Sequence, residues 1–202
     1  LPACNTVIFD EAHQLPETAS MFFGDSASTG QMLDLARDTR AEALAAARDF
    51  LPLQEATRSL EKAARDLRLA VPGENARLGY EQVVGRREFV AALDGVEAEL
   101  EHFVVLAESQ AARSEGLEKC WQRATELHAR VSNWRRLAQP ETIRWVEVFS
   151  QSAALNTTPL NVASIFRKQI EGNAKSWIFT SATLAVGKSF GHYCGELGLD
   201  AL

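Results

Sequence analysis

Hydrophobic and polar positions divide the chain into short strand-like segments near both ends and a long helical middle. Two runs are almost wholly apolar and rich in β-branched and aromatic residues, namely "TVIFD" (Thr6 to Asp10) and "SWIFTS" (Ser176 to Ser181). Polar or small residues bound each run, as is typical of buried strands in a parallel sheet. We therefore expect one short strand near each end of the chain.

Between these runs, hydrophobic residues recur at intervals of three and four, which is the spacing of one face of an α-helix. The pattern predicts four helices whose apolar faces can cover one another. Their apolar positions run from Leu33 to Leu51, from Leu53 to Ala70, from Phe89 to Ala107 and from Leu117 to Trp134. In the first helix the face consists of Leu33, Ala36, Leu44, Ala47 and Leu51, and the pattern continues up to Pro52.

After Pro140 the spacing changes to the alternation of a strand. "TIRWVEVF" (Thr142 to Phe149) and "AALNTT" (Ala153 to Thr158) are separated by "SQS", which predicts a β-hairpin. A last helix is expected to begin near Asn161, a residue type that caps helix N-termini, and to end at Gly172.

Composition narrows the class of protein. The chain has 202 residues, of which 46% are hydrophobic and 24% charged, so it can bury a globular core in one or two domains. Its formal net charge of −6 gives no general attraction to nucleic acid or to an anionic membrane. No apolar run is long enough to span a membrane, and the N-terminus lacks the regions of a signal peptide. We therefore expect a cytoplasmic protein with no membrane contact.

The cysteines and the chain ends add two expectations. Cys4, Cys120 and Cys194 are far apart and odd in number, which favours reduced thiols over a disulfide framework and gives no paired spacing for a metal. The chain begins without methionine and ends in what reads as the middle of an α/β unit. We expect it to be a fragment of a longer protein.

The first strand leads into "VIFDEAHQLP" (Val7 to Pro16), where two adjacent carboxylates follow an apolar run. Nucleotide hydrolysis needs such a pair, because one carboxylate holds Mg²⁺ through water and the next orients the attacking water. Consecutive residues at a strand end point in different directions, so Asp10 and Glu11 can divide these tasks. The alternative is a pair of solvated acids that favour a helix dipole. The apolar run before the pair and "AHQLP" after it favour the catalytic interpretation.

These residues resemble a known family. "VIFDEAHQLPE" resembles motif II, the Walker B or DEAH box, of XPD-like superfamily 2 DNA helicases, and "WIFTSATL" (Trp177 to Leu184) resembles their motif III. The run "LPACNTVIFDEAHQLPETASMFF" is especially similar to the DinG/YoaA branch. In these helicases a large helical insertion, the Arch domain, separates the two motifs within the first RecA-like motor domain.

The resemblance implies an α/β P-loop (RecA-like) helicase domain fragment with a large, mainly α-helical Arch insertion, a few parallel strands and a β-hairpin. Residues 1–16 would be the motif II part of the motor domain, residues 17–141 the Arch-like insertion, and residues 142–202 the hairpin, a helix and the motif III part. In the family's sheet the two motif strands would be parallel neighbours.

Function also follows from the resemblance. It implies an ATP-dependent DNA helicase that moves 5′-to-3′ on single-stranded or forked DNA. The helicase would act in DNA repair or replication and would have a repair or replication protein as a partner. ATP and Mg²⁺ would be cofactors, and an iron–sulphur cluster would have its ligands elsewhere in the full-length protein. Hydrolysis needs groups from further motifs at the same phosphate, so residues 1–202 alone are expected to be inactive.

Roles are carried over to the matching positions. The resemblance implies that Asp10 binds Mg²⁺ through water and that Glu11 activates the hydrolytic water. His13 would couple the nucleotide site to motif III, where Ser181 and Thr183 supply hydroxyl groups. The alternative for these two hydroxyls is capping of the following helix.

The middle of the chain is acidic overall, with 16 basic residues against 21 acidic ones between Glu17 and Glu141, so we do not expect a broad DNA-binding surface there. The exception is the fourth predicted helix and its end. The candidates for DNA contact there are Lys119, Arg123, Arg130, Arg135 and Arg136. The alternative is a solvated basic face that covers the apolar Trp134.

Two other functions stay open at this point. "ATLAVGKS" (Ala182 to Ser189) fits a relaxed phosphate-loop pattern, which would make the protein a P-loop NTPase or kinase that holds phosphate with Lys188 and Ser189. This loop would follow the Walker B motif, which is the wrong order for a simple P-loop domain, so we expect Gly187 and Lys188 to begin an exposed helix instead. The other alternative is a helical protein-interaction module, in which the nucleotide motifs serve only as framework.

Overall fold

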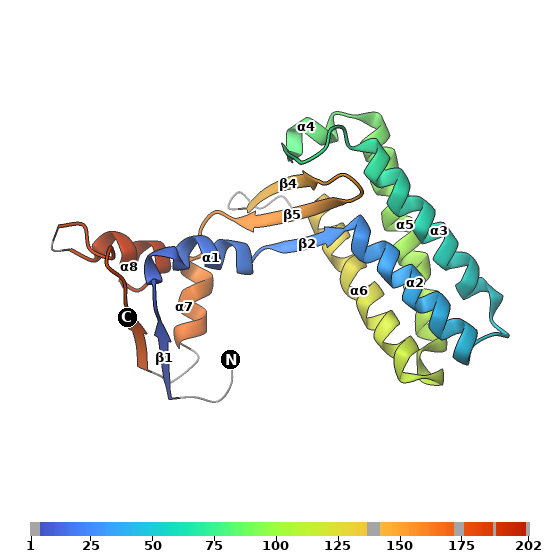
Figure 1. Ribbon diagram of the computed structural model, residues 1–202, viewed down its shortest axis with the longest axis horizontal. Helices are drawn as coiled ribbons and strands as arrows, with labels where there is room; N and C mark the ends of the chain where they lie inside the picture. The colour runs from blue at the N-terminus through green and yellow to red at the C-terminus, as the bar shows by residue number, and fades with distance from the viewer. Residues whose placement is uncertain (1–4, 137–141, 172–175, 188, 201–202) are drawn as a thin grey trace. The chain divides into compact units, whose positions relative to one another are not determined.

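The computed structural model describes residues 5–136, 142–171, 176–187 and 189–200 (Figure 1). Within these ranges the chain forms two compact units. Residues 5–24, 142–143 and 158–200 form the two-stranded unit, and residues 25–136 and 144–157 form the helical unit. The boundaries expected from the resemblance instead place residues 144–157 with the C-terminal segment. In the described ranges no helix is both long and apolar enough to cross a membrane.

The two apolar runs form strands β1 (Thr6–Phe9) and β6 (Ser176–Phe179), which pair in parallel in the two-stranded unit. Thr6 lies opposite Ser176, and Phe9 lies opposite Phe179. Both strands and their parallel pairing are therefore confirmed. Because parallel neighbours need a crossover connection, the long middle of the chain leaves this sheet after β1 and returns to it at β6.

Side chains of this sheet alternate between two faces. On one face Phe9 stacks on Trp177 and Phe179, with ring centroids 6.0 and 5.5 Å apart. This face packs against a core built from the short 3₁₀-helix η1 (Ala12–Gln14), α1 (Leu15–Phe22), α7 (Ala163–Glu171) and α8 (Gly191–Leu197). On the other face Ile8 and Ile178 are 63% and 43% exposed.

The ends of α7 and α8 show why particular residues are needed. Asn161 accepts a hydrogen bond from the amide of Ala163 at 2.8 Å, which confirms the predicted helix start, whereas the predicted end at Gly172 lies outside the described residues. Gly198 ends α8 with a φ of 68°. A Cβ atom at Gly198 would lie 2.6 Å from the carbonyl oxygen of Ala163, so both the backbone conformation and the close approach require glycine.

Four long helices form the core of the helical unit (Figure 1). They are α2 (Thr29–Ala46), α3 (Leu51–Ala70), α5 (Arg87–Gln110) and α6 (Glu115–Arg136). A 3₁₀-turn, η2 (Ala111–Arg113), joins α5 to α6. The apolar positions predicted for the third and fourth helices are all buried, and those of the second are buried as far as Leu67. These faces form one continuous core.

The face predicted for the first helix is only partly right, because Ala36 and Ala47 are buried whereas two of its leucines are not. Leu44 and Leu51 are 47% and 61% exposed, and the buried residues of α2 are Thr29, Met32, Leu35, Ala36, Thr39 and Ala43. Thr39 lies on this buried face and interrupts its apolar pattern, which is why the pattern predicted the exposed Leu44 in its place. The helix also ends at Ala46 rather than near Pro52, which instead lies in the first turn of α3, where proline is favoured.

A four-stranded sheet has the order β2 (Asp25–Ser28), β5 (Ala153–Pro159), β4 (Thr142–Val148) and β3 (Ala76–Gly79). The predicted hairpin is confirmed as β4 and β5, and its turn closes where the amide of Phe149 donates to the carbonyl of Ser152 at 2.8 Å. The outer strands β2 and β3 pair antiparallel with β5 and β4. A short helix, α4 (Tyr80–Val84), follows β3.

Candidate functional site

The adjacent carboxylates lie directly after β1, at the carboxyl end of the parallel pair. Asp10 follows the last residue of the strand, and Glu11 adopts a left-handed backbone with φ 49° and ψ 42°. This conformation is uncommon for a residue with a side chain and recurs at functional sites. The turn sends the chain away from the strand into η1, so both side chains are exposed at the sheet edge.

One oxygen of Asp10 receives every hydrogen bond that the described residues make to this carboxylate. Oδ1 accepts from the amide of Glu11 at 3.0 Å and from the hydroxyl of Thr180 at 2.9 Å. Thr180 directly follows β6, and its backbone amide donates to the carbonyl of Phe9 at 2.9 Å. The end of β6 therefore holds the carboxylate that ends β1.

His13 joins this loop to the second motif. Its Nδ1 atom lies 2.8 Å from the hydroxyl oxygen of Ser181 and 3.2 Å from Oε2 of Glu11. In the described part of the chain Thr183 enters through its backbone amide, which donates to the Ser181 hydroxyl oxygen at 3.3 Å. The structure thus brings His13, Ser181 and Glu11 together, and Thr183 supports Ser181 rather than touching His13.

Thr180 is the residue of this site that the sequence did not single out. The register of the two parallel strands places the residues that follow Phe9 and Phe179 side by side. Those residues are Asp10 and Thr180. Only the register, which the sequence alone does not give, connects them.

The carboxylates fit a magnesium ion held mainly by water and phosphate. Mg²⁺ prefers oxygen ligands and commonly uses one or two protein carboxylates. Oδ2 of Asp10 receives no hydrogen bond from the described residues, so it is available for such a role. Across the described ranges no group of three or more His, Cys, Asp or Glu side chains can hold a metal by itself.

Burial raises the pKa of the Cys120 thiol, as expected for a core residue.

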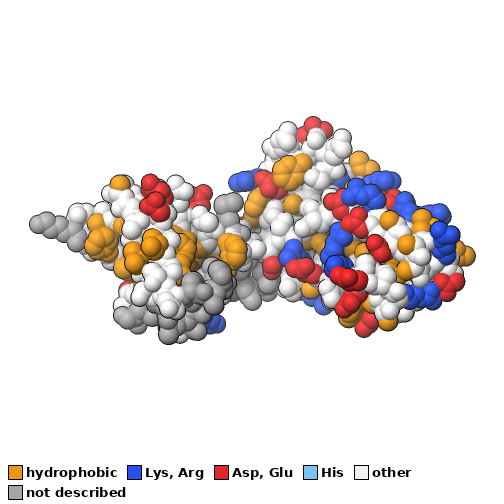
Figure 2. Space-filling model, turned by 60° about the horizontal axis from the view of Figure 1, so that its bottom comes forward, with side chains coloured by type: hydrophobic (Ala, Val, Ile, Leu, Met, Phe, Trp, Pro, Cys, Tyr) orange, Lys and Arg blue, Asp and Glu red, His pale blue; other side chains and the backbone are white. Residues whose placement is uncertain are grey.

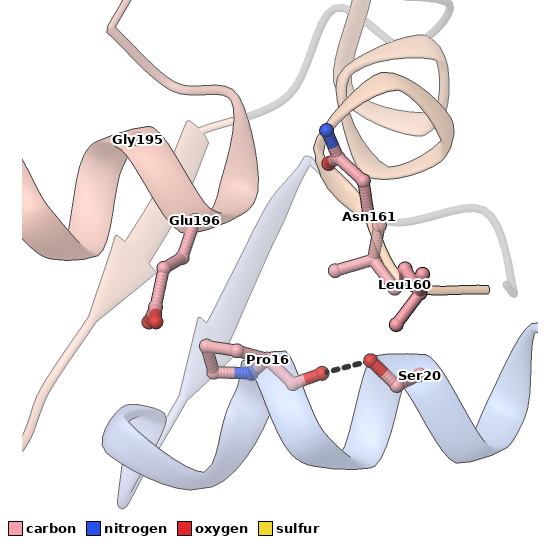
Figure 3. Close-up of a pocket in the computed structure, with 7 residues that line it drawn as sticks. Pro16, Ser20, Leu160, Asn161, Gly195 and Glu196 are labelled. Atoms are coloured by element: carbon pink, nitrogen blue, oxygen red, sulfur yellow. Dashed lines mark hydrogen bonds between the residues drawn. The ribbon is translucent and has the colours of Figure 1, made fainter. Parts of the chain in front are cut away.

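A cavity in the same unit is a separate feature (Figure 3). It has a volume of about 380 Å³ and lies between α1, α8 and the segment before α7. Its lining residues are Pro16, Ser20, Leu160, Asn161, Val162, Gly195 and Glu196. Asp10 and Glu11 do not line it. The cavity is therefore not the place where these carboxylates would meet a phosphate chain.

The segment that fits a phosphate-loop pattern does not have phosphate-loop geometry. Val186 and Ser189 form a two-way backbone pairing at 3.0 and 3.2 Å, with Gly187 at a φ of 67° in the turn between them. The next helix, α8, begins only at Gly191. A helix expected to begin at Gly187 and Lys188 is therefore wrong for Gly187, and Lys188 lies outside the described residues.

Each basic residue proposed for DNA contact has an acidic partner. On α6, Lys119 pairs with Glu115 at 2.6 Å, Arg123 with Asp38 at 2.7 Å, and Arg130 with Glu126 at 2.6 Å. Figure 2 shows basic and acidic side chains interspersed over the visible face of this unit. A DNA phosphate would have to compete with these carboxylates.

Arg135 and Arg136 converge on Glu97 of α5. The side chain of Glu97 is only 8% exposed and lies 2.5 Å from Arg135 and 3.0 Å from Arg136. The hydroxyl of Ser132 also donates to it. Burial alone would raise the pKa of Glu97, but the hydrogen bonds from Ser132 and Arg135 and the charges of both arginines lower it below its ordinary value. These contacts hold α5 against α6.

Replacing Glu97 with glutamine is expected to lower the free energy of unfolding by about 1–2 kcal/mol at neutral pH, because Ser132, Arg135 and Arg136 lose the charge of their buried acceptor while the two arginines themselves remain exposed to solvent. Since folding lowers the pKa of Glu97, its contribution is present above the ordinary glutamate pKa of about 4.3 and disappears as the pH falls through the folded value. Denaturant unfolding between neutral pH and pH 3 measures this effect. Glu101→Gln, an exposed carboxylate on the same helix, is the control. A difference that does not shrink in acid would contradict this role.

Comparison with known proteins supports the resemblance along the whole chain. No protein-family profile matches. The ATP-dependent DNA helicase YoaA of Escherichia coli (strain K12) is 34% identical over 200 residues, which cover 99% of this chain and 31% of that protein. The protein of the same name from Haemophilus influenzae (strain ATCC 51907 / DSM 11121 / KW20 / Rd) is 30% identical over 204 residues, with the same coverage. The chain therefore corresponds, over nearly its full length, to a segment of about a third of a YoaA-type helicase.

Proposed function

We propose that this chain is part of an ATP-dependent DNA helicase and carries motifs II and III of its first RecA-like motor domain on either side of an Arch-type helical insertion. One observation carries the proposal. Strands β1 and β6 are parallel neighbours, and their ends bring Asp10, Glu11, His13 and Ser181 to one edge although the two motifs are far apart in sequence. The match to the YoaA helicases over 99% of the chain supports it.

In this proposal the two carboxylates divide the work of ATP hydrolysis. A bound Mg²⁺ ion would offset the charge of the phosphates. Asp10 would hold the metal's water shell through Oδ2, while its Oδ1 accepts hydrogen bonds within the protein. Glu11 would accept a hydrogen bond from the attacking water and orient it. Nδ1 of His13 contacts both Glu11 and Ser181. A movement of the Glu11 carboxylate, or of an ATP phosphate beside it, would therefore reach motif III through the imidazole.

The finer parts of the proposal concern DNA. We place the helicase in the cytoplasm, on single-stranded or forked DNA, with 5′-to-3′ movement in repair or replication. The helical insertion would lie beside the single-stranded DNA. A second role for the helical unit, binding of a repair or replication protein, is favoured by the pairing of all five candidate DNA-contact cations with carboxylates.

Unwinding by the complete helicase tests the proposal. With ATP and Mg²⁺, we expect it to separate a duplex that carries a 5′ single-stranded tail and to leave a matched duplex with a 3′ tail paired. Asp10→Asn should lose most of this activity, since it weakens the metal site. Fluorescence of a labelled displaced strand measures the rate. ATP hydrolysis that DNA does not stimulate, with neither duplex unwound, would contradict the proposal.

A further inference from the structure

We infer that Thr180 is a positioning residue for Asp10, whose hydroxyl group fixes one carboxylate oxygen so that the other faces the water shell of Mg²⁺. The inference rests on the proposed function, because it assigns a role within the same site. Its starting point is the asymmetry of the Asp10 carboxylate, in which Oδ1 accepts two hydrogen bonds and Oδ2 accepts none from the described residues.

The two bonds to Oδ1 differ in what they control. The amide of Glu11, at 3.0 Å, belongs to the neighbouring residue and moves with Asp10 itself. The hydroxyl of Thr180, at 2.9 Å, comes from the other strand and ties the carboxylate to a fixed point outside its own loop. A hydroxyl that donates to a charged carboxylate makes a stronger bond than one between neutral groups. Thr180 is therefore the contact that sets the rotation of the carboxylate.

The backbone of Thr180 is held on both sides. Its amide donates to the carbonyl of Phe9 at 2.9 Å, and its carbonyl accepts from the amide of Ala12 at 3.0 Å. These bonds continue the pairing of β1 and β6 past the last paired residues, Phe9 and Phe179. The hydroxyl also lies 3.3 Å from the carbonyl of Phe9, so the longer distance makes this the weaker of its two acceptors. The side chain therefore starts from a rigid position.

Thr180 differs from the two hydroxyl residues that follow it. The Ser181 hydroxyl contacts His13, and Thr183 donates its amide to Ser181. Motif III therefore has two separate tasks at this edge. Thr180 orients the metal-facing acid, and Ser181 contacts the histidine that accompanies the water-orienting acid. Loss of the Thr180 hydroxyl should act on the metal ion first, whereas loss of the Ser181 hydroxyl should act on coupling.

The test compares Thr180→Val, which keeps the branched shape and removes the hydroxyl, with Thr180→Ser, which keeps the hydroxyl. Both changes are made in the complete helicase. Electron paramagnetic resonance titration measures the affinity of Mn²⁺ for the enzyme loaded with a non-hydrolysable ATP analogue. We expect about 10-fold weaker Mn²⁺ binding in Thr180→Val, because groups that orient a metal-facing ligand typically contribute that much. Thr180→Ser should stay within about 2-fold of the wild type, and the Mg²⁺ concentration for half-maximal ATP hydrolysis should follow the same order.

Thr6→Val is the matched control, because Thr6 is an exposed threonine at the opposite end of β1. It should leave Mn²⁺ affinity unchanged. Unchanged Mn²⁺ affinity in Thr180→Val, in an enzyme that still hydrolyses ATP, would overturn the positioning role and leave the proposed function intact. Equal losses in the valine and serine variants, together with a lower melting temperature, would also overturn it in favour of a packing role. A wild-type helicase that does not hydrolyse ATP would overturn both.

Discussion

Replacing Glu11 with glutamine in the complete helicase is expected to lower the turnover of ATP by about 100-fold or more, while ATP affinity changes only a few-fold. Glutamine keeps the size of the side chain and one oxygen near the Glu11 Oε2 position, 3.2 Å from Nδ1 of His13. It removes the negative charge that, in the role we propose for Glu11, orients the attacking water. Binding energy and catalysis should therefore separate in this variant.

Two measurements distinguish this result from a general loss of structure. Single-turnover hydrolysis gives the rate of the chemical step, and binding of a fluorescent ATP analogue gives the affinity. Glu17→Gln is a suitable control, because Glu17 is an exposed acid in the first turn of α1, six residues after Glu11. Turnover within a few-fold of the wild type in Glu11→Gln would exclude the role given to Glu11.

The structure confirms the parts of the fold that have a strong periodic signal. The third and fourth predicted helices bury every residue expected, because apolar residues recur at helical spacing from Phe89 and from Leu117 without a polar interruption. The same signal failed in α2, where Thr39 lies on the buried face. A buried threonine is hard to recognise from sequence, because its neighbours decide whether its hydroxyl and methyl groups can be accommodated.

Short edge strands carried no such signal. β2 has the sequence "DSAS" and buries only Ala27. Its conformation is set by pairing with β5 and by Ser28, whose hydroxyl accepts from the amide of Gln31 at 3.1 Å at the start of α2. Both bonding partners, β5 and the amide of Gln31, lie outside the four residues of the strand. A local pattern therefore could not predict it.

The residues of the candidate site likewise divide into those that a local sequence motif reveals and those that only the folded structure reveals. Asp10, Glu11 and His13 are close in sequence and could be recognised as one motif, and the resemblance added Ser181. Thr180 required the register of two strands at opposite ends of the chain. The basic residues of α6 show the same limit for charge, because their sequence spacing gave a stripe but not the carboxylates opposite them. Asp38 and Glu97, which pair with Arg123 and Arg135, come from other helices.

Loss of either partner in the His13–Ser181 contact is expected to reduce DNA unwinding about 10-fold, with a much smaller effect on ATP hydrolysis. The contact is 2.8 Å long and joins the loop of the acidic pair to motif III, so it can transmit the state of the nucleotide only while both groups are present. His13→Ala and Ser181→Ala should therefore have similar effects. The double variant should be little worse than either single variant, which corresponds to a coupling energy of about 1 kcal/mol.

The measured quantity is the number of base pairs unwound per ATP hydrolysed, because it separates coupling from turnover. A second cycle that combines His13→Ala with Glu17→Gln provides the control, since Glu17 lies on α1 and is not part of the contact. Effects in that cycle should add. Strictly additive losses for His13 and Ser181 would show that the two groups act independently, and Ser181 would then serve the turn around Thr183 rather than the histidine.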